Sequence, residues 1–120
     1  MLDSLKPTRT GKRWPRGQRF VLTALGASAE VAYREAVQAA RAQGRAALDQ
    51  AQAGWAAPLA LEPSDGVVLS ELRQGRRSIA DVARNLDDCG TSLAEVKASV
   101  DRLAEAALIE PAPAAASAAL

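Results

Sequence analysis

Two helix-start signatures in the C-terminal half of the 120-residue chain constrain its fold more than any other feature. Ser78 is followed three residues later by Asp81, and Ser92 is followed in the same way by Glu95. In each pair the hydroxyl can accept from a free amide of the first helical turn while the acid answers from the third position. We therefore expect one helix to begin after Ser78 and another after Ser92.

Apolar residues after both caps recur at steps of three and four, the period of a helix with one buried face. In the first helix they are Ile79, Val82, Ala83 and Leu86, and in the second Leu93, Val96, Val100, Leu103 and Ala107. A further apolar helix precedes them from Gly66. We expect three short helices in helix-turn-helix order, with Leu103 buried against Leu72, Ile79 and Leu86.

The residues that define this pattern are Leu69, Leu72, Gly75, Ser78, Ile79, Val82, Ala83, Leu86, Val96, Val100, Leu103, Leu108 and Ile109. On these residues the segment resembles the winged helix-turn-helix superfamily. In that family a strand at positions like Leu108 to Glu110 turns into a two-stranded wing. Here the chain runs instead into a Pro- and Ala-rich tail. The resemblance therefore implies a winged-helix-like unit whose wing is missing or vestigial, a unit that serves DNA binding, dimerisation or protein docking.

The rest of the chain also favours helices. Aromatic residues make up 3% of the chain, so the core must be built from Leu, Val and Ala, which favours closely packed helices and an all-α fold. We expect Ser28 to cap a helix from Ala29 to about Gln43 and a second helix to span Arg45 to Ala53, with Trp55 folding back onto this hairpin. Before them, Pro15 to Leu25 is predicted as a helix capped by Gly26, with a short strand at Arg19 to Thr23 as the alternative.

These elements predict a basic flexible arm at 1–14, a helical hairpin region at 15–55 and a linker at 56–63. A helix-turn-helix unit at 64–110 and a disordered Ala/Pro tail at 111–120 complete the chain. Pro58 and Pro63 forbid a continuous helix through the linker.

Charge divides the chain unevenly. The first nineteen residues hold six basic residues and one acid, whereas the remainder holds nine basic and thirteen acidic residues. A basic arm of this kind can follow a phosphate backbone, with Trp14 free to stack on a base. The alternative is a solvated tail that contacts no partner.

Catalysis is not expected, and neither is a cofactor or a metal. The chain has no histidine, the commonest general base and metal ligand near neutral pH. Its single cysteine, Cys89, adjoins Asp87 and Asp88, which should raise the pKa of the thiol. No apolar run approaches the length of a membrane span, so we expect no membrane contact and a cytoplasmic location.

Two functions remain open. The first is a small DNA-binding protein, a transcriptional regulator or nucleoid-type factor that binds duplex DNA as a homodimer. Its candidate contacts are Lys6, Arg9, Lys12, Arg13, Arg16, Arg73, Arg76, Arg77, Arg84, Ser92, Lys97 and Ser99. The second is an adaptor that uses the helix-turn-helix as a docking module for a larger protein of a signalling or motility complex. The acidic third helix favours the adaptor, and the arm and arginine cluster favour DNA.

Overall fold

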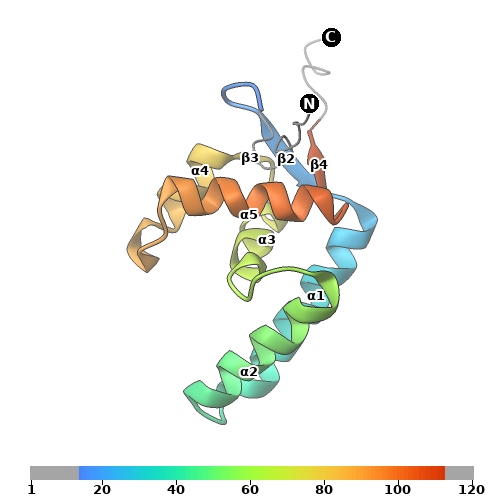
Figure 1. Cartoon of the computed structure of the whole chain (residues 1–120), viewed down its shortest axis with the longest axis vertical. Coiled ribbons are helices and arrows are strands. Elements are labelled where there is room, and N and C mark those ends of the chain that lie inside the picture. The colour runs from blue at the N-terminus through green and yellow to red at the C-terminus, as the bar shows by residue number, and fades with distance from the viewer. Residues whose placement is uncertain (1–13, 113–120) are drawn as a thin grey trace, which may run out of the picture.

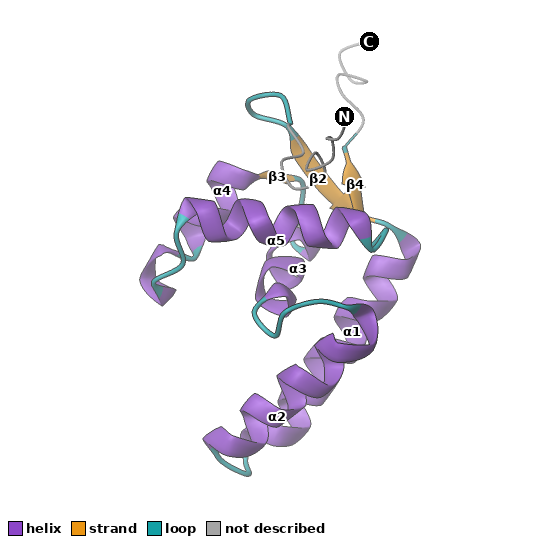
Figure 2. Ribbon diagram, in the orientation of Figure 1, coloured by secondary structure: helices purple, strands orange, loops and turns teal. Residues whose placement is uncertain are grey.

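The computed structural model describes residues 14–112, and it is predominantly helical with one small sheet (Figure 1, Figure 2). The helices are α1 (Ala24–Arg41), α2 (Arg45–Ala56), α3 (Asp65–Arg73), α4 (Ile79–Asn85) and α5 (Leu93–Glu105). Short 3-10 helices follow α2 (Ala57–Leu59) and α4 (Asp87–Cys89). The strands are β2 (Arg19–Leu22), β3 (Arg77–Ser78) and β4 (Ile109–Pro111). The predicted mobility of residues 1–13 and of the tail from 113 onward lies outside the described residues.

The sheet places an N-terminal strand between two strands from the other half of the chain. β2 runs antiparallel to both neighbours in the order β3-β2-β4. Phe20 pairs with Arg77 on one side and with Pro111 on the other. The strand alternative for Arg19 to Thr23 was therefore right and the helix from Pro15 to Leu25 was wrong. The all-α prediction omitted this sheet.

The core lies where α3, α4 and α5 meet the inner face of the sheet. Its largest fully buried apolar side chains are Phe20, Leu69, Val82, Val96, Val100, Leu103 and Leu108. Leu103 is completely buried in a cluster with Leu72 and Leu86, with Ile79 packed against it, as predicted. Leu93 and Ala107 are exposed instead. Leu93 is the first residue of α5, and Ala107 lies beyond the end of α5 with a left-handed φ of 64°.

Both predicted capping boxes are present. The hydroxyl of Ser78 accepts from the amide of Asp81, and the hydroxyl of Ser92 accepts from the amide of Glu95, each at 3.1 Å. In each pair the carboxylate of the acid accepts a hydrogen bond from the backbone amide of the capping serine. Local sequence therefore fixes where α4 and α5 begin.

α1 and α2 pack against each other and project away from the sheet (Figure 1). Trp55 contacts the hairpin as predicted, but it does so from within α2, which continues to Ala56 and does not end at Ala53. Its indole N–H donates to the carbonyl of Ala29 at 3.0 Å. The start of α1 was predicted wrongly, because Thr23 rather than Ser28 caps it by accepting from the amide of Gly26 at 3.0 Å. Gly26 does not end a helix. It lies in the first turn of α1, where a Cβ would collide with the carbonyl oxygen of Leu108.

Candidate nucleic-acid interface

The basic N-terminal segment joins the described structure beside α5. The indole N–H of Trp14 donates to a carboxylate oxygen of Asp101 on α5 at 3.0 Å. Its ring meets the buried ring of Phe20 edge to face, with centroids 4.9 Å apart. Trp14 is thus packed into the fold, and it does not stand free to stack on a base as the sequence suggested. Trp14, the last residue of the predicted arm, is therefore held against α5.

A tight turn connects Trp14 to β2. The amide of Gln18 donates to the carbonyl of Pro15 at 3.0 Å, and Gly17 has a φ of 77°, a left-handed conformation that favours glycine. The turn holds Arg16 exposed next to the start of α4 and the first turns of α5. A hollow of about 230 Å³ separates these elements, and both Arg16 and Lys97 line it. Two cations from distant parts of the sequence therefore border one surface.

The first turn of α5 also contributes an apolar group to this hollow. Leu93 is 58% exposed and lines the hollow together with Ile79. Lys97 lies one turn further along α5 and pairs with Asp101 at 2.8 Å. Ser92 uses its hydroxyl as the cap of α5, so it is already bonded to a backbone amide.

Ser99 does not belong to this surface, although the sequence suggested that it approaches bases. Its side chain is 3% exposed and donates to Asp65 at 2.6 Å. Arg102 makes two bonds of 2.8 Å to the same carboxylate. These bonds raise the pKa of Arg102 and direct its positive charge at the carboxylate of Asp65. Both side chains tie α5 to the start of α3, because Asp65 is completely buried and needs these donors.

The predicted arginine cluster consists largely of residues in ion pairs. Arg73 bonds to the buried carboxylate of Glu30 at 3.2 Å. Arg77 lies 3.9 Å from Glu71, and Arg84 pairs with Asp81 one turn earlier on α4. Arg76 is exposed, and within residues 14–112 it forms no ion pair. Of these four, Arg76 is the one without an ion-pair partner in the described part of the chain, although Arg84 also keeps 69% of its side chain exposed.

The acids in the first turns of α4 and α5 also stabilise the fold. The backbone amide of Ser78 holds the pKa of Asp81 below its usual value, and the hydroxyl of Ser78 and the guanidinium of Arg84 act in the same direction. The capping acid of α5, Glu95, bonds to the amide of Ser92 at 2.8 Å.

Four candidate contacts, Lys6, Arg9, Lys12 and Arg13, lie outside the described residues. Sequence reasoning also missed two buried carboxylates, Glu30 and Asp65. Each is completely buried and held by arginine. The side-chain donors to Asp65, Ser99 and Arg102, lie more than thirty positions away along the chain, so no local pattern could have indicated these two contacts.

Within residues 14–112 there is no group of three or more His, Cys, Asp or Glu side chains that could hold a metal ion. None of the helices in that range has the length and apolar character needed to cross a membrane. No family model, curated protein or solved structure matches this chain.

Proposed function

We propose that this chain is a small non-enzymatic protein that binds duplex DNA through the basic arm, the turn at Pro15 to Gln18 and the first turns of α5. The observation that carries the proposal is the bond from Trp14 to Asp101, because it fixes the root of the arm on α5. A basic segment and an exposed helix face that act on one duplex must lie together, and this bond keeps them together.

In this proposal the chain consists of a helical hairpin followed by a winged-helix-like unit at 64–110. Its α5 is the helix that enters the major groove. Three helices in that order, with a strand before α4 and a strand after α5, support it. The strand paired with β4 is β2, which comes from the opposite end of the chain. The turn at Pro15 to Gln18 that precedes β2 therefore stands where the tip of a wing would lie.

The residues divide by what they reach. We assign phosphate contacts, which position a protein without reading sequence, to Lys6, Arg9, Lys12, Arg13, Arg16 and Arg76. Lys97 and the exposed Leu93 lie on the first turns of α5, where a recognition helix meets base edges. Arg73 and Arg77 are left out because their ion pairs serve the fold, and Ser99 is left out because it is buried.

One double variant and one control variant test this assignment. Arg16→Ala combined with Lys97→Ala should weaken binding to a duplex by about tenfold or more, since two cations at the surface are lost. Arg45→Ala, on α2, removes a charge whose side chain is 85% exposed, and should change affinity by less than about twofold. Fluorescence anisotropy of a labelled duplex at low salt measures both. Equal losses in both variants would show that only net charge matters.

A second candidate function is an adaptor of a signalling or motility complex that uses the winged-helix-like unit as a docking module. The charge of α5 favours it, because Glu95, Asp101 and Glu105 face partly or fully outward and the charge of Arg102 is directed at Asp65. Pairing with a second copy stays a prediction from the alanine-rich helices. An adaptor would show no affinity for duplex DNA.

A further inference from the structure

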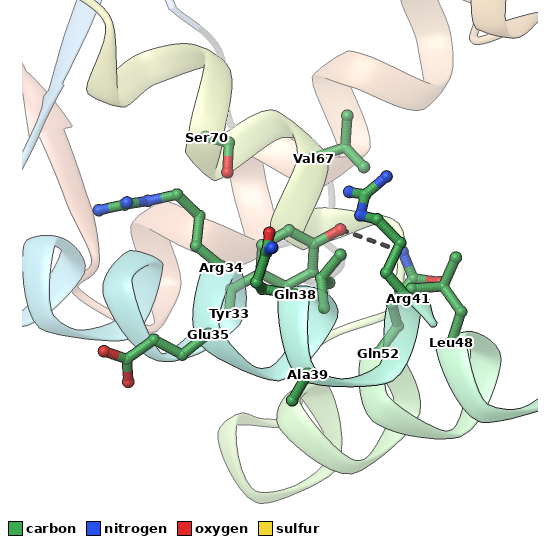
Figure 3. Close-up of a pocket in the computed structure, with 11 residues that line it drawn as sticks. Tyr33, Arg34, Glu35, Gln38, Ala39, Arg41, Leu48, Gln52, Val67 and Ser70 are labelled. Carbon is green, nitrogen blue, oxygen red and sulfur yellow. Dashed lines mark hydrogen bonds between the residues drawn. The ribbon is translucent and has the colours of Figure 1, made fainter. Parts of the chain in front are cut away.

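A second candidate surface lies on the helical hairpin, away from the sheet. The side chains of α1, α2 and α3 enclose an open groove of about 770 Å³. This volume is within the range of about 300 to 1,000 Å³ that is typical of binding clefts. Its lining residues are Tyr33, Arg34, Glu35, Val37, Gln38, Ala39, Arg41, Leu48, Gln52, Val67 and Ser70 (Figure 3).

Contacts from α2 and α3 hold Tyr33 in place at the floor of the groove. Tyr33 is buried, and its hydroxyl accepts a hydrogen bond of 3.0 Å from the side-chain amide of Gln52 on α2. Its ring also meets Trp55 edge to face at 4.9 Å. A Cβ at Gly66 of α3 would collide with the Tyr33 ring, so the glycine lets α3 approach the floor closely. Val37, Leu48 and Val67 provide aliphatic surface from all three helices.

One end of the groove carries Arg34, which is fixed on a buried carboxylate that Arg73, from outside the lining, also contacts. Glu30 is completely buried and accepts from Nε of Arg34 at 2.9 Å and from Oγ of Ser70 at 3.0 Å. Nε of Arg73 lies 3.2 Å from the same carboxylate. One negative charge therefore faces two positive charges, and about half of each arginine side chain is exposed. A guanidinium bound through Nε keeps its terminal N–H groups for another acceptor.

At the other end Arg41 rises from α1 toward the side of the groove formed by α3 (Figure 3). It is exposed, and it makes no ion pair with any residue in the described range. The acid of the lining, Glu35, points away from Ser70 and Val67 in the same view. The groove thus has an aliphatic middle between positively charged ends.

We propose that this groove binds an amphipathic helix of a protein partner, with aliphatic side chains against Val37, Leu48 and Val67 and carboxylates on Arg34 and Arg41. A helix fits better than an extended segment, because the walls are helices whose backbone groups are already bonded and offer no strand edge. Acidic flanks follow from the charge of the two ends. Residues 1–13 contain one acid and residues 113–120 contain none, so neither end of this chain has the required charge.

The proposal is independent of DNA binding, since the groove and the Trp14 surface share no residue. A duplex would also be a poor occupant, because phosphates gain nothing from an aliphatic wall. The two surfaces together would let the chain hold DNA and a protein partner at once.

A titration of the full chain with a synthetic helix tests the proposal. The probe is a peptide of about 14 residues with leucine at helical spacing and glutamate on both flanks, long enough for about four turns. Backbone amide shifts should change at Tyr33 to Arg41 and at Val67 to Ser70. A matched peptide with lysine in place of every glutamate should not bind.

Charge reversal provides the control within the protein. Arg41→Glu should lower the affinity for the acidic peptide by about tenfold and allow the lysine peptide to bind. Arg45→Glu, outside the groove, should change the affinity for either peptide by less than about twofold. The proposal fails if the acidic peptide does not bind at low salt, if both peptides bind equally, or if the shifts map to α5. A duplex that moves the groove amides would overturn it as well. Loss of a dimer on Arg41→Glu would contradict it too, because the occupant would then be a second copy.

Discussion

The carboxylate of Asp101 joins two elements, because one of its oxygens accepts from the indole N–H of Trp14 at 3.0 Å and the other from Lys97 at 2.8 Å. Asp101 is the point at which the N-terminal segment meets α5. An acid on the outer face of α5 looked like evidence against DNA. In the structure its charge is shared between a lysine and an indole of the same surface, so it repels a phosphate less than an unpaired carboxylate would.

Loss of Arg102 should destabilise the fold far more than loss of Lys97, although both pair with an acid. Arg102→Ala leaves the completely buried carboxylate of Asp65 without its charged partner, which costs about 3 to 5 kcal/mol. Lys97→Ala breaks a partly exposed pair worth at most about 1 kcal/mol. Urea unfolding of both variants gives the comparison. Equal losses would mean that Asp65 is reached by water.

The two leucines of α5 should also differ in how much they contribute to the stability of the fold. Leu103→Ala creates a cavity in the core and should cost about 2 to 5 kcal/mol, whereas Leu93 is 58% exposed, so Leu93→Ala should cost less than about 0.5 kcal/mol. Thermal unfolding followed by circular dichroism measures both. A parental melting temperature for Leu103→Ala would show that the register of α5 is wrong.

Alanine should have opposite effects at two helical glycines. Gly26→Ala drives a Cβ into the backbone carbonyl of Leu108, which cannot rotate away, so the strand and helix must separate. Gly54→Ala, in α2, meets no atom within 4 Å and should stabilise by about 0.5 to 1 kcal/mol. Chemical denaturation of the two variants tests the close approach of α1 to Leu108. A Gly26→Ala protein as stable as the parent would disprove this close approach.

Asp81 should make the fold sensitive to acid. Its pKa is lower in the folded state, mainly because the backbone amide of Ser78 donates to it, so the folded state binds fewer protons than the unfolded chain. The stabilisation is therefore complete above the unfolded pKa of about 3.9 and disappears as the pH falls below it through the folded value. Asp81→Asn should lower the unfolding free energy at about pH 6 and much less at about pH 3. A difference independent of pH would exclude the charge as its cause.

Local patterns predicted well what depends on neighbours in sequence. Ser78 and Ser92 cap their helices because each needs only the acid three residues later. The face of α5 that carries Val96, Val100 and Leu103 followed from helical period alone. The predicted start of α1 was wrong because Thr23 and Ser28 are both good caps. The pairing of β2 with β4 decides which of the two begins the helix.

The site could be predicted only in part. Arg16 and Lys97 were both named from their charge, yet no pattern indicated that one hollow brings them together. Ser99 was predicted to face outward because it is not part of the apolar stripe of α5, yet its hydroxyl is buried on Asp65. Arg73 was predicted to hold phosphate and instead holds Glu30, since only the fold places a carboxylate of α1 against α3.

The affinity of the parent chain for duplex DNA as a function of salt tests the central claim most directly. Six phosphate contacts should cost about 10³-fold or more in affinity between about 50 and about 200 mM salt, because each contact releases a condensed counterion. Anisotropy of a labelled duplex across that range gives the slope, which should be shallower in the Arg16→Ala, Lys97→Ala variant. No measurable binding at about 50 mM salt, where the electrostatic attraction is strong, would contradict the account.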